Sequence, residues 1–164
     1  MEMDGEKIYI MSKFKMHKVG VIPFDIRSDR IAILFVTSQT RGRWILPKGS
    51  QKKGETHEVS AKRGALEEAG VDGDLFLNFP MTVPITKQGS SGVIKTPVTY
   101  YPLLISEQLE EWAEKDKRQR HWSLLKDTDK VTDRADFLSL INQFRELSPW
   151  ILDVAKHRKE VPIL

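Results

Sequence analysis

Residues 49–71, GSQKKGETHEVSAKRGALEEAGV, constrain the fold of this chain more than any other stretch. The stretch begins as a loop rich in Gly and Lys and continues into a segment that ends at Gly70. Thr56 is a suitable N-cap, and Gly70 suits the position just after a helix, so a helix is predicted between them. The sequence therefore predicts one continuous loop–helix–loop unit.

The predicted helix has two faces of different character. The apolar face is expected to pack against a sheet and consists of Val59, Ala65, Leu66 and Ala69. Positions 64, 67 and 68 lie on one helical face, because residues three and four apart are neighbours on a helix. This face is expected to be directed away from the sheet. Glu67 and Glu68 are adjacent carboxylates, which indicates either a solvated surface or a divalent cation held by oxygen ligands.

Most of the remaining chain is predicted to form strands. They are expected at residues 17–26, 31–37, 44–46, 75–86, 93–105 and 121–125. The first two are nearly continuous apolar runs separated by the turn residues RSD, which predicts a hairpin buried on both faces. Pro47 ends the third strand.

The C-terminal third predicts a second helix. Apolar residues at helical spacing mark an amphipathic helix at 135–147, and Pro149 is expected to open a further helical segment. Strands, a helix, more strands and a terminal helix together predict an α+β sandwich.

Length and composition limit the class of protein. A chain of 164 residues fits one domain, predicted over residues 1–164, with 1–15 as a flexible leader unless residues 8–10 add an edge strand. The absence of cysteine excludes disulfides and thiolate metal sites. No signal peptide or membrane anchor is evident, so a cytoplasmic location is expected. The net charge of +3 does not imply a nucleic-acid partner.

The spacing of several polar residues resembles a known motif. The residues are Gly49, Glu55, Arg63, Glu67, Glu68, Gly70 and the aliphatic Val71. Their spacing resembles the Nudix box, G-x5-E-x7-R-E-U-x-E-E-x-G-U with U aliphatic, and a chance match with one miss is roughly one in ten thousand. The preceding WILPKG, residues 44–49, resembles the segment that leads into the box. The resemblance implies a Nudix-type α/β/α sandwich with a mixed sheet, a catalytic loop–helix–loop and a C-terminal helix.

The resemblance also implies a chemistry. Nudix enzymes hydrolyse a nucleoside diphosphate linked to another group, or a related pyrophosphate. By resemblance, Glu67 and Glu68 would hold Mg²⁺ or Mn²⁺, with the carbonyl of Gly49 as a further oxygen ligand. Arg63 and Glu55 would pair to hold the loop against the helix.

Gly64 departs from the motif. The family has Glu at this position, as a metal ligand or as the base that activates water, and Gly carries neither function. Since Mg²⁺ is commonly held by one or two carboxylates with waters and phosphates, we expect retained metal binding and weakened turnover. Candidates for a replacement base are Glu107, Glu110, Glu111 and Glu114, although their spacing also fits a solvated helix with pairs at i and i+4.

Basic residues indicate the class of substrate. Five border the motif and suit an extended polyanion: Arg41, Arg43, Lys48, Lys52 and Lys53. The later WAEKDKRQRHW, residues 112–122, is similar to a segment of the diphosphoinositol polyphosphate phosphohydrolase branch, and WILPKG resembles both that branch and the diadenosine polyphosphate hydrolases. An inositol pyrophosphate or a dinucleoside polyphosphate is therefore the expected substrate, for a monomer or homodimer without a membrane or nucleic-acid partner.

Two functions remain open from the sequence. The first is a divalent-metal-dependent Nudix pyrophosphohydrolase, favoured by Arg63, Glu55 and the carboxylate pair. The second is a binding or sensor module that kept the fold and lost catalysis, favoured by Gly64. The four histidines are scattered without the spacing of metal ligands, and an interaction domain for a partner protein has no specific support.

Overall fold

The computed structural model describes residues 17–160, so the predicted leader and the edge strand at 8–10 lie outside the described residues. The strands are β1 Lys18–Arg27, β2 Arg30–Thr37, β3 Trp44–Ile45, β4 Lys48–Ser50, β5 Val71–Leu75, β6 Met81–Gly89, β7 Gly92–Gln108 and β8 Arg120–Leu124. The helices are α2 His57–Ala69 and α3 Ala135–Glu160, with the short 3₁₀ helices η1 Lys115–Lys117 and η2 Leu125–Lys130.

The strands form one mixed sheet. Its main order is β3-β2-β1-β7-β5, and β4, β6 and β8 add to β1, β7 and β2 respectively. The strands β1 and β7 run parallel, with Lys18 opposite Val98 and Phe24 opposite Leu104. The other pairings are antiparallel.

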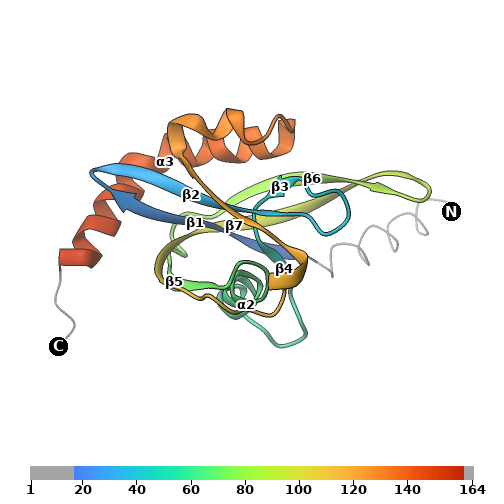
Figure 1. The fold of residues 1–164 in the computed structure, drawn as a ribbon, viewed down its shortest axis with the longest axis horizontal. Helices are drawn as coiled ribbons and strands as arrows, with labels where there is room; N and C mark the ends of the chain where they lie inside the picture. The colour runs from blue at the N-terminus through green and yellow to red at the C-terminus, as the bar shows by residue number, and fades with distance from the viewer. Residues whose placement is uncertain (1–16, 161–164) are drawn as a thin grey trace, which may run out of the picture.

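Helices cover the two faces of this sheet. Figure 1 shows α2 on one side and α3 on the other, which confirms the predicted α/β/α arrangement. On the α3 side, Phe24 of β1 meets Phe144 edge to face, with 5.8 Å between ring centroids. On the α2 side, the buried residues Ala61, Ala65 and Ala69 allow the helix axis to approach the sheet closely.

The first hairpin agrees with the sequence prediction. The strands β1 and β2 pair from Phe24–Ile33 to Arg27–Arg30, and both are buried along most of their length. The two turn residues, Ser28 and Asp29, have φ values of 50° and 61°. Positive φ at both central positions matches the twist of the flanking strands, which is why short polar residues occupy this turn.

Two predicted elements are wrong. The single strand expected at 75–86 is two strands, β5 and β6, because the chain turns at 76–80, where the Phe79 amide donates to the carbonyl of Phe76. The solvated helix considered for 107–116 is instead the end of β7 followed by a loop and η1. The predicted ion pairs of that segment nevertheless form, since Glu111 meets Lys115 and Glu114 meets Arg118.

The terminal helix is longer than predicted. Instead of a second segment that opens at Pro149, α3 continues through this residue to Glu160. Proline has no N–H to donate to the carbonyl of Arg145, four residues earlier. The hydroxyl of Ser148 donates to that carbonyl at 2.7 Å and so supplies the missing hydrogen bond. Over the described residues, neither α2 nor α3 is long and apolar enough to cross a bilayer.

Candidate active site

The ends of α2 are fixed by local capping, as the sequence predicts. The Thr56 hydroxyl accepts a hydrogen bond from the Val59 amide at 3.2 Å. At the other end, Gly70 has φ 64°, and its amide donates to the carbonyls of Ala65 and Leu66. A residue in this left-handed conformation ends the helix and starts the turn into β5.

The orientation of α2 differs from the prediction. Val59 and Leu66, expected to pack on the sheet, are 52% and 42% exposed. The buried face instead carries Ser60, Ala61, Gly64, Ala65, Glu68 and Ala69. Small side chains let the helix lie close to the sheet, so close packing rather than bulk hydrophobicity selects the inner face.

The loop before α2 is held by an ion pair. Arg63 donates to the Glu55 carboxylate and also, at 2.8 Å, to the carbonyl of Ser50. Glu55 further accepts from the Lys52 amide at 2.7 Å and the Ser60 hydroxyl at 3.1 Å. Burial acts to raise the pKa of Glu55, but these donors outweigh it and hold the pKa below its ordinary value. The expected Glu55–Arg63 pair is therefore present.

The two adjacent carboxylates point to different surroundings. Glu68 is buried, where its Oε2 accepts from the Lys48 amide at 3.2 Å and its Oε1 lies 3.5 Å from Arg118. Burial raises the pKa of Glu68 despite these positive neighbours. Glu67 is half exposed, and its nearest ionic partner is Arg63 at 3.9 Å. The expectation that both carboxylates look away from the sheet is wrong for Glu68.

Gly64 lies where α2 crosses β4. A Cβ at this position would lie 3.1 Å from the backbone nitrogen of Gly49 and from the carbonyl carbon of Lys48. Such contacts are tighter than normal, so the lack of a side chain lets β4 approach the helix. This contact also places the Lys48 amide within reach of Glu68.

A cavity of about 440 Å³ opens over Glu68. Among the described residues, seven cationic side chains line it: Lys18, Arg41, Arg43, Lys48, Lys87, Arg118 and Arg134. Glu68 is the acidic residue of this lining, and none of the described lining residues is aromatic. Burial lowers the pKa of Lys48 to about 8, because desolvation disfavours its charged form. The cavity is thus suited to a compact anion.

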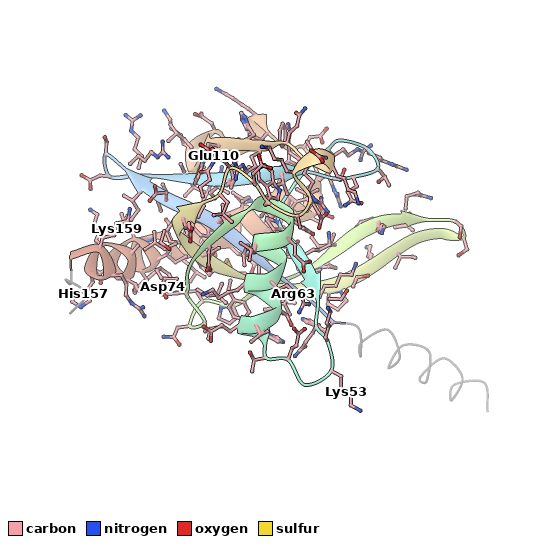
Figure 2. The ribbon with its side chains drawn as sticks, turned by 60° about the horizontal axis from the view of Figure 1, so that its bottom comes forward. Lys53, Arg63, Asp74, Glu110, His157 and Lys159 are labelled. Atoms are coloured by element: carbon pink, nitrogen blue, oxygen red, sulfur yellow. The ribbon has the colours of Figure 1, made fainter. Side chains whose placement is uncertain are left out.

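The predicted substrate residues divide into two groups. Arg41, Arg43 and Lys48 line the cavity, whereas Lys52 and Lys53 lie outside its lining. Figure 2 shows Lys53 at the outer tip of the loop before α2, while Arg63 lies against the helix. Contact of these two lysines with substrate stays a prediction, and it requires a ligand that extends beyond the cavity.

Four lining cations had not been predicted. Lys18, Lys87, Arg118 and Arg134 come from β1, β6, the loop before β8 and the start of α3. Only Arg118 belongs to a segment that the sequence singles out, the WAEKDKRQRHW stretch. The fold brings the others together across long separations that residue spacing does not reveal.

One predicted distal acid lies beside the site. Glu114 accepts from Gln39 at 2.6 Å and from Arg118 Nε at 2.9 Å, so it is joined to Glu68 through the Arg118 guanidinium. Glu107, Glu110 and Glu111 are exposed, which agrees with the solvated alternative for these three.

The loop after β7 also supports the end of α2. Trp112 donates from its indole nitrogen to the carbonyl of Glu68 at 3.1 Å. Arg120 lies over the Trp112 ring at 3.9 Å and donates to the carbonyl of Ala69 at 3.1 Å. The C-terminal end of a helix carries partial negative charge, which attracts a cation, so this contact stabilises the segment that carries Glu68.

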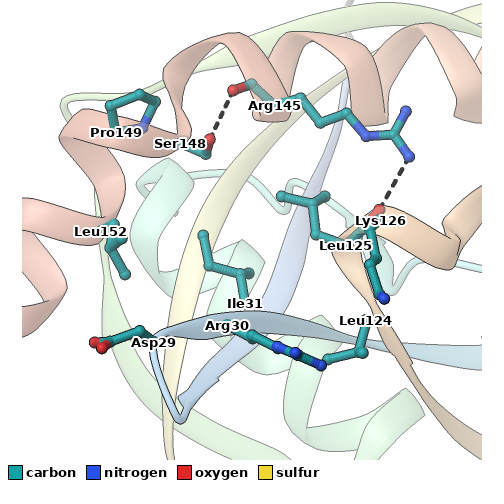
Figure 3. A pocket seen from close by; sticks show the side chains of 10 residues that line it. All are labelled: Asp29, Arg30, Ile31, Leu124, Leu125, Lys126, Arg145, Ser148, Pro149 and Leu152. Carbon is teal, nitrogen blue, oxygen red and sulfur yellow. Dashed lines mark hydrogen bonds between the residues drawn. The ribbon is translucent and has the colours of Figure 1, made fainter.

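A larger cavity of about 630 Å³ lies elsewhere, between α3 and the β1–β2 turn. Figure 3 shows it lined by Ile31, Leu124, Leu125 and Leu152 with a polar rim. Two of its charged side chains are engaged in structural contacts: Arg145 donates to the carbonyl of Leu125 at 2.9 Å, and Asp29 pairs with Lys156 at 2.9 Å. This cavity has no residue of the loop–helix–loop unit in its lining, whereas Glu68 of α2 lines the cationic cavity, which is therefore the candidate active site.

The acidic groups of the site suit a loosely held cation. Within residues 17–160, no group of three His, Asp or Glu side chains converges as a ready metal site. Mg²⁺ is often bound by one or two carboxylates while waters and substrate phosphates complete its shell. That the half-exposed Glu67 and the buried Glu68 share such an ion stays a prediction. The role of the Gly49 carbonyl stays a prediction.

Comparison with known proteins identifies the family. A sequence model described as NUDIX domain matches residues 16–139, so the chain belongs to the Nudix family. The prediction of an enzyme of the Nudix hydrolase class is thereby confirmed, and this family generally uses divalent metals. The branch within the family stays a prediction.

Related sequences and structures agree with this assignment. Two relatives from Arabidopsis thaliana, Nudix hydrolases 17 and 18, both named mitochondrial, are each 32% identical to this chain. Each match covers 72% of this chain, and the two matches cover 67% and 69% of the relatives' own lengths. A C. elegans Ap4A hydrolase binary complex has a TM-score of 0.64 at 20% identity, covering 82% of this chain and 98% of that one. The NUDIX domain of Shewanella oneidensis NrtR complexed with ADP ribose gives 0.62 at 22% identity, covering 80% and 86%. These two structures share the fold.

Proposed function

We propose that this chain hydrolyses a pyrophosphate linkage in a multiply phosphorylated substrate, with an inositol pyrophosphate or a dinucleoside polyphosphate as the favoured candidates. The observation that carries the proposal is the cationic cavity over Glu68 on the Nudix helix. A cytoplasmic location and a monomer or homodimer are part of the same proposal.

The cavity offers what phosphoryl transfer requires. Negative charge is spread over the phosphoryl oxygens in the transition state, so catalysis depends mainly on positioning and on opposite charge. Arg41 and Arg43 supply guanidinium groups, each of which can donate two parallel hydrogen bonds to a phosphate. Lys48 adds a compact positive charge to the lining of the cavity. These side chains hold the substrate so that its pyrophosphate lies against Glu68.

Glu67 and Glu68, with the Gly49 carbonyl, would hold Mg²⁺ or Mn²⁺, which lowers the pKa of a bound water and neutralises the pyrophosphate. The side chains of Glu55 and Arg63 hold the loop and the helix that would carry this chemistry. Glu55 and Arg63 fix the loop on α2 through four hydrogen bonds. One bond joins the two side chains, and the other three join them to Ser50, Lys52 and Ser60. Groups that orient ligands in this way commonly change activity by about 10- to 100-fold when lost.

The rival function is a binding or sensor module on the same fold. Two observations favour it: Gly64 carries no carboxylate, and Arg118 already neutralises part of the charge of Glu68. Retention of the whole Glu55–Arg63 network favours hydrolysis.

The deciding experiment is phosphate release from a panel of substrates with Mg²⁺ or Mn²⁺. The panel includes inositol pyrophosphates, diadenosine tetraphosphate and ADP-ribose, since the last two are named with the structural neighbours. We expect turnover of at least one compact polyphosphate and a loss of at least about tenfold in Glu68→Gln. Lys126→Gln, remote from the cationic cavity, is the matched control. Binding without turnover for every substrate would establish the rival function.

A further inference from the structure

The charges of the cationic cavity are unbalanced. Seven cationic residues and one acidic residue line it. Two of the cations have further acidic partners outside the lining, since Arg118 pairs with Glu114 at 2.9 Å and Arg134 pairs with Asp136 at 2.7 Å. Positive charge still exceeds negative charge around the cavity. This excess attracts an anion before any metal ion is added.

Arg118 holds a central position between two acids. Its side chain is 9% exposed, and its NH2 and Nε atoms lie 3.5 Å from Glu68 and 2.9 Å from Glu114. Its NH1 atom donates to the carbonyl of Thr37 at 2.8 Å, which fixes the guanidinium plane. Arginine keeps its charge at all relevant pH values. A permanent cation therefore stands between Glu68 and Glu114, where these acids would otherwise repel each other and an incoming phosphate.

The contact of Arg118 with Glu68 is looser than its contact with Glu114. At 3.5 Å, the Glu68 pair is an ion pair rather than a short hydrogen bond. An incoming phosphate oxygen is a strong acceptor for the same donor. The NH2 group of Arg118 can thus donate to a ligand while Glu114 and Thr37 keep the guanidinium in place.

We propose that this cavity binds phosphorylated ligands without a divalent cation, because Arg118, Lys48 and the surrounding basic side chains already supply the positive charge that screens Glu68. A divalent ion is then needed for bond cleavage and not for binding. This inference concerns the same site as the proposed function, but it holds whether or not the chain turns substrate over.

The test is isothermal titration calorimetry with inorganic tripolyphosphate on the whole chain. Titrations are run in EDTA and, separately, with Mg²⁺ in excess over the probe. We expect dissociation constants that agree within about threefold between the two conditions. Binding that is weaker by about tenfold or more in EDTA, or undetectable there, would overturn the inference.

Variants assign the binding to the cavity. In EDTA, Arg118→Gln should weaken binding by about tenfold or more, since hydrogen bonds to charged groups are the strong ones. Because Arg118 also supports the end of β2, Arg43→Gln and Lys87→Gln serve as exposed alternatives, and each should weaken binding. Lys126→Gln should bind as the wild type does. Unchanged binding in all three cavity variants would overturn the inference.

The calorimetry and the hydrolysis panel test the two proposals independently, so either proposal can be wrong while the other holds. Binding in EDTA without turnover of any substrate supports this inference and defeats the proposed hydrolysis. Turnover with Mg²⁺ together with loss of binding in EDTA supports the hydrolysis and defeats this inference.

Discussion

Gly64 is the residue that separates this chain from the motif it otherwise matches. Replacement by Glu restores the carboxylate at the position where the family carries one. We expect Gly64→Glu to raise kcat by at least about tenfold, since a positioned base contributes about 10²–10⁴-fold. Steady-state phosphate release with Mg²⁺ on the best substrate of the panel measures the effect.

Gly64→Ala is the matched control for that change. It adds the same Cβ beside Lys48 and Gly49 without the carboxylate. Helix propensity favours Ala by about 0.8–1 kcal/mol, and the three-residue strand β4 needs to move only slightly, so we expect stability within about 1 kcal/mol of wild type. Its kcat should stay at the wild-type level. An equal gain in kcat for both variants would assign the effect to helix packing, and no gain in Gly64→Glu would show that another group is the base.

The sequence predicted contacts between residues of the site that are close along the chain, but not contacts between residues that are far apart along it. The pairing of Glu55 with Arg63, which the resemblance to the Nudix box implies, joins a loop and a helix that adjoin in sequence, and the structure contains it. Lys18, Lys87 and Arg134 come together only because β1, β6 and α3 meet in space. Spacing along the chain carries no information on such contacts, so these three of the seven cationic lining residues were missed, as was Arg118.

At the scale of elements, the C-terminus of α2 depends on Gly70 for two separate reasons. Its φ of 64° suits glycine, and a Cβ there would lie 2.8 Å from three atoms of Trp112. The left-handed conformation costs Ala about 1–2 kcal/mol, and the clash adds about 1–3 kcal/mol. We therefore expect Gly70→Ala to lower the free energy of unfolding by about 2–5 kcal/mol, measured by urea denaturation.

Gly42→Ala isolates the first of these reasons. Gly42 has φ 61°, nearly the same as Gly70, but a Cβ there meets no atom within 4 Å among the described residues. Its loss of stability should be only about 1–2 kcal/mol. Equal losses at the two glycines would show that Trp112 moves away without cost and does not fix the end of the helix.

Elements were predictable where their signals are local. The bounds of α2 follow from Thr56 and Gly70, and the first hairpin follows from two apolar runs around a polar turn. The strand β5 was missed because VDGDL has little β-branched character and is held by its pairing with β7. The inner face of α2 was predicted only in part: Ala65 and Ala69 are buried as expected, whereas Val59 and Leu66 are exposed, because the sheet and β4 determine which small residues lie inside.

For the whole molecule, the distribution of charge matters more than its sum. The net charge is only +3, yet seven cationic residues line one cavity. The rest of the chain carries 22 Asp and Glu residues against 19 Lys and Arg residues, and this acidic excess offsets the charge of the cavity. Figure 2 shows His157 and Lys159 at the end of α3, away from the loop that carries Lys53. A modest total charge therefore coexists with a strongly positive site.

Stability of the whole fold should also depend on pH through His17, where β1, α2 and β7 meet. The His17 ring stacks on His57 at 5.8 Å and shares a hydrogen bond of 3.0 Å with Thr99, while His57 bonds to Tyr101 at 2.8 Å. Burial, and then the charge of His57, lower the pKa of His17 below 6.5. The folded state therefore binds fewer protons than the unfolded state around this pH.

The sign of the effect follows from linkage. Where the unfolded state binds more protons, stability rises with pH. The contribution of His17 is thus fully present above pH 6.5 and is lost as the pH falls through 6.5 toward the lower pKa of the folded state. Glu68, whose pKa burial raises, acts in the opposite direction, so only a comparison of variants isolates His17. His17→Gln keeps a partner for Thr99 but cannot titrate. Thermal melts between pH 5 and 8 should show a smaller loss of Tm toward acid in His17→Gln than in wild type, whereas parallel curves would mean that the His17 ring accepts its proton without cost.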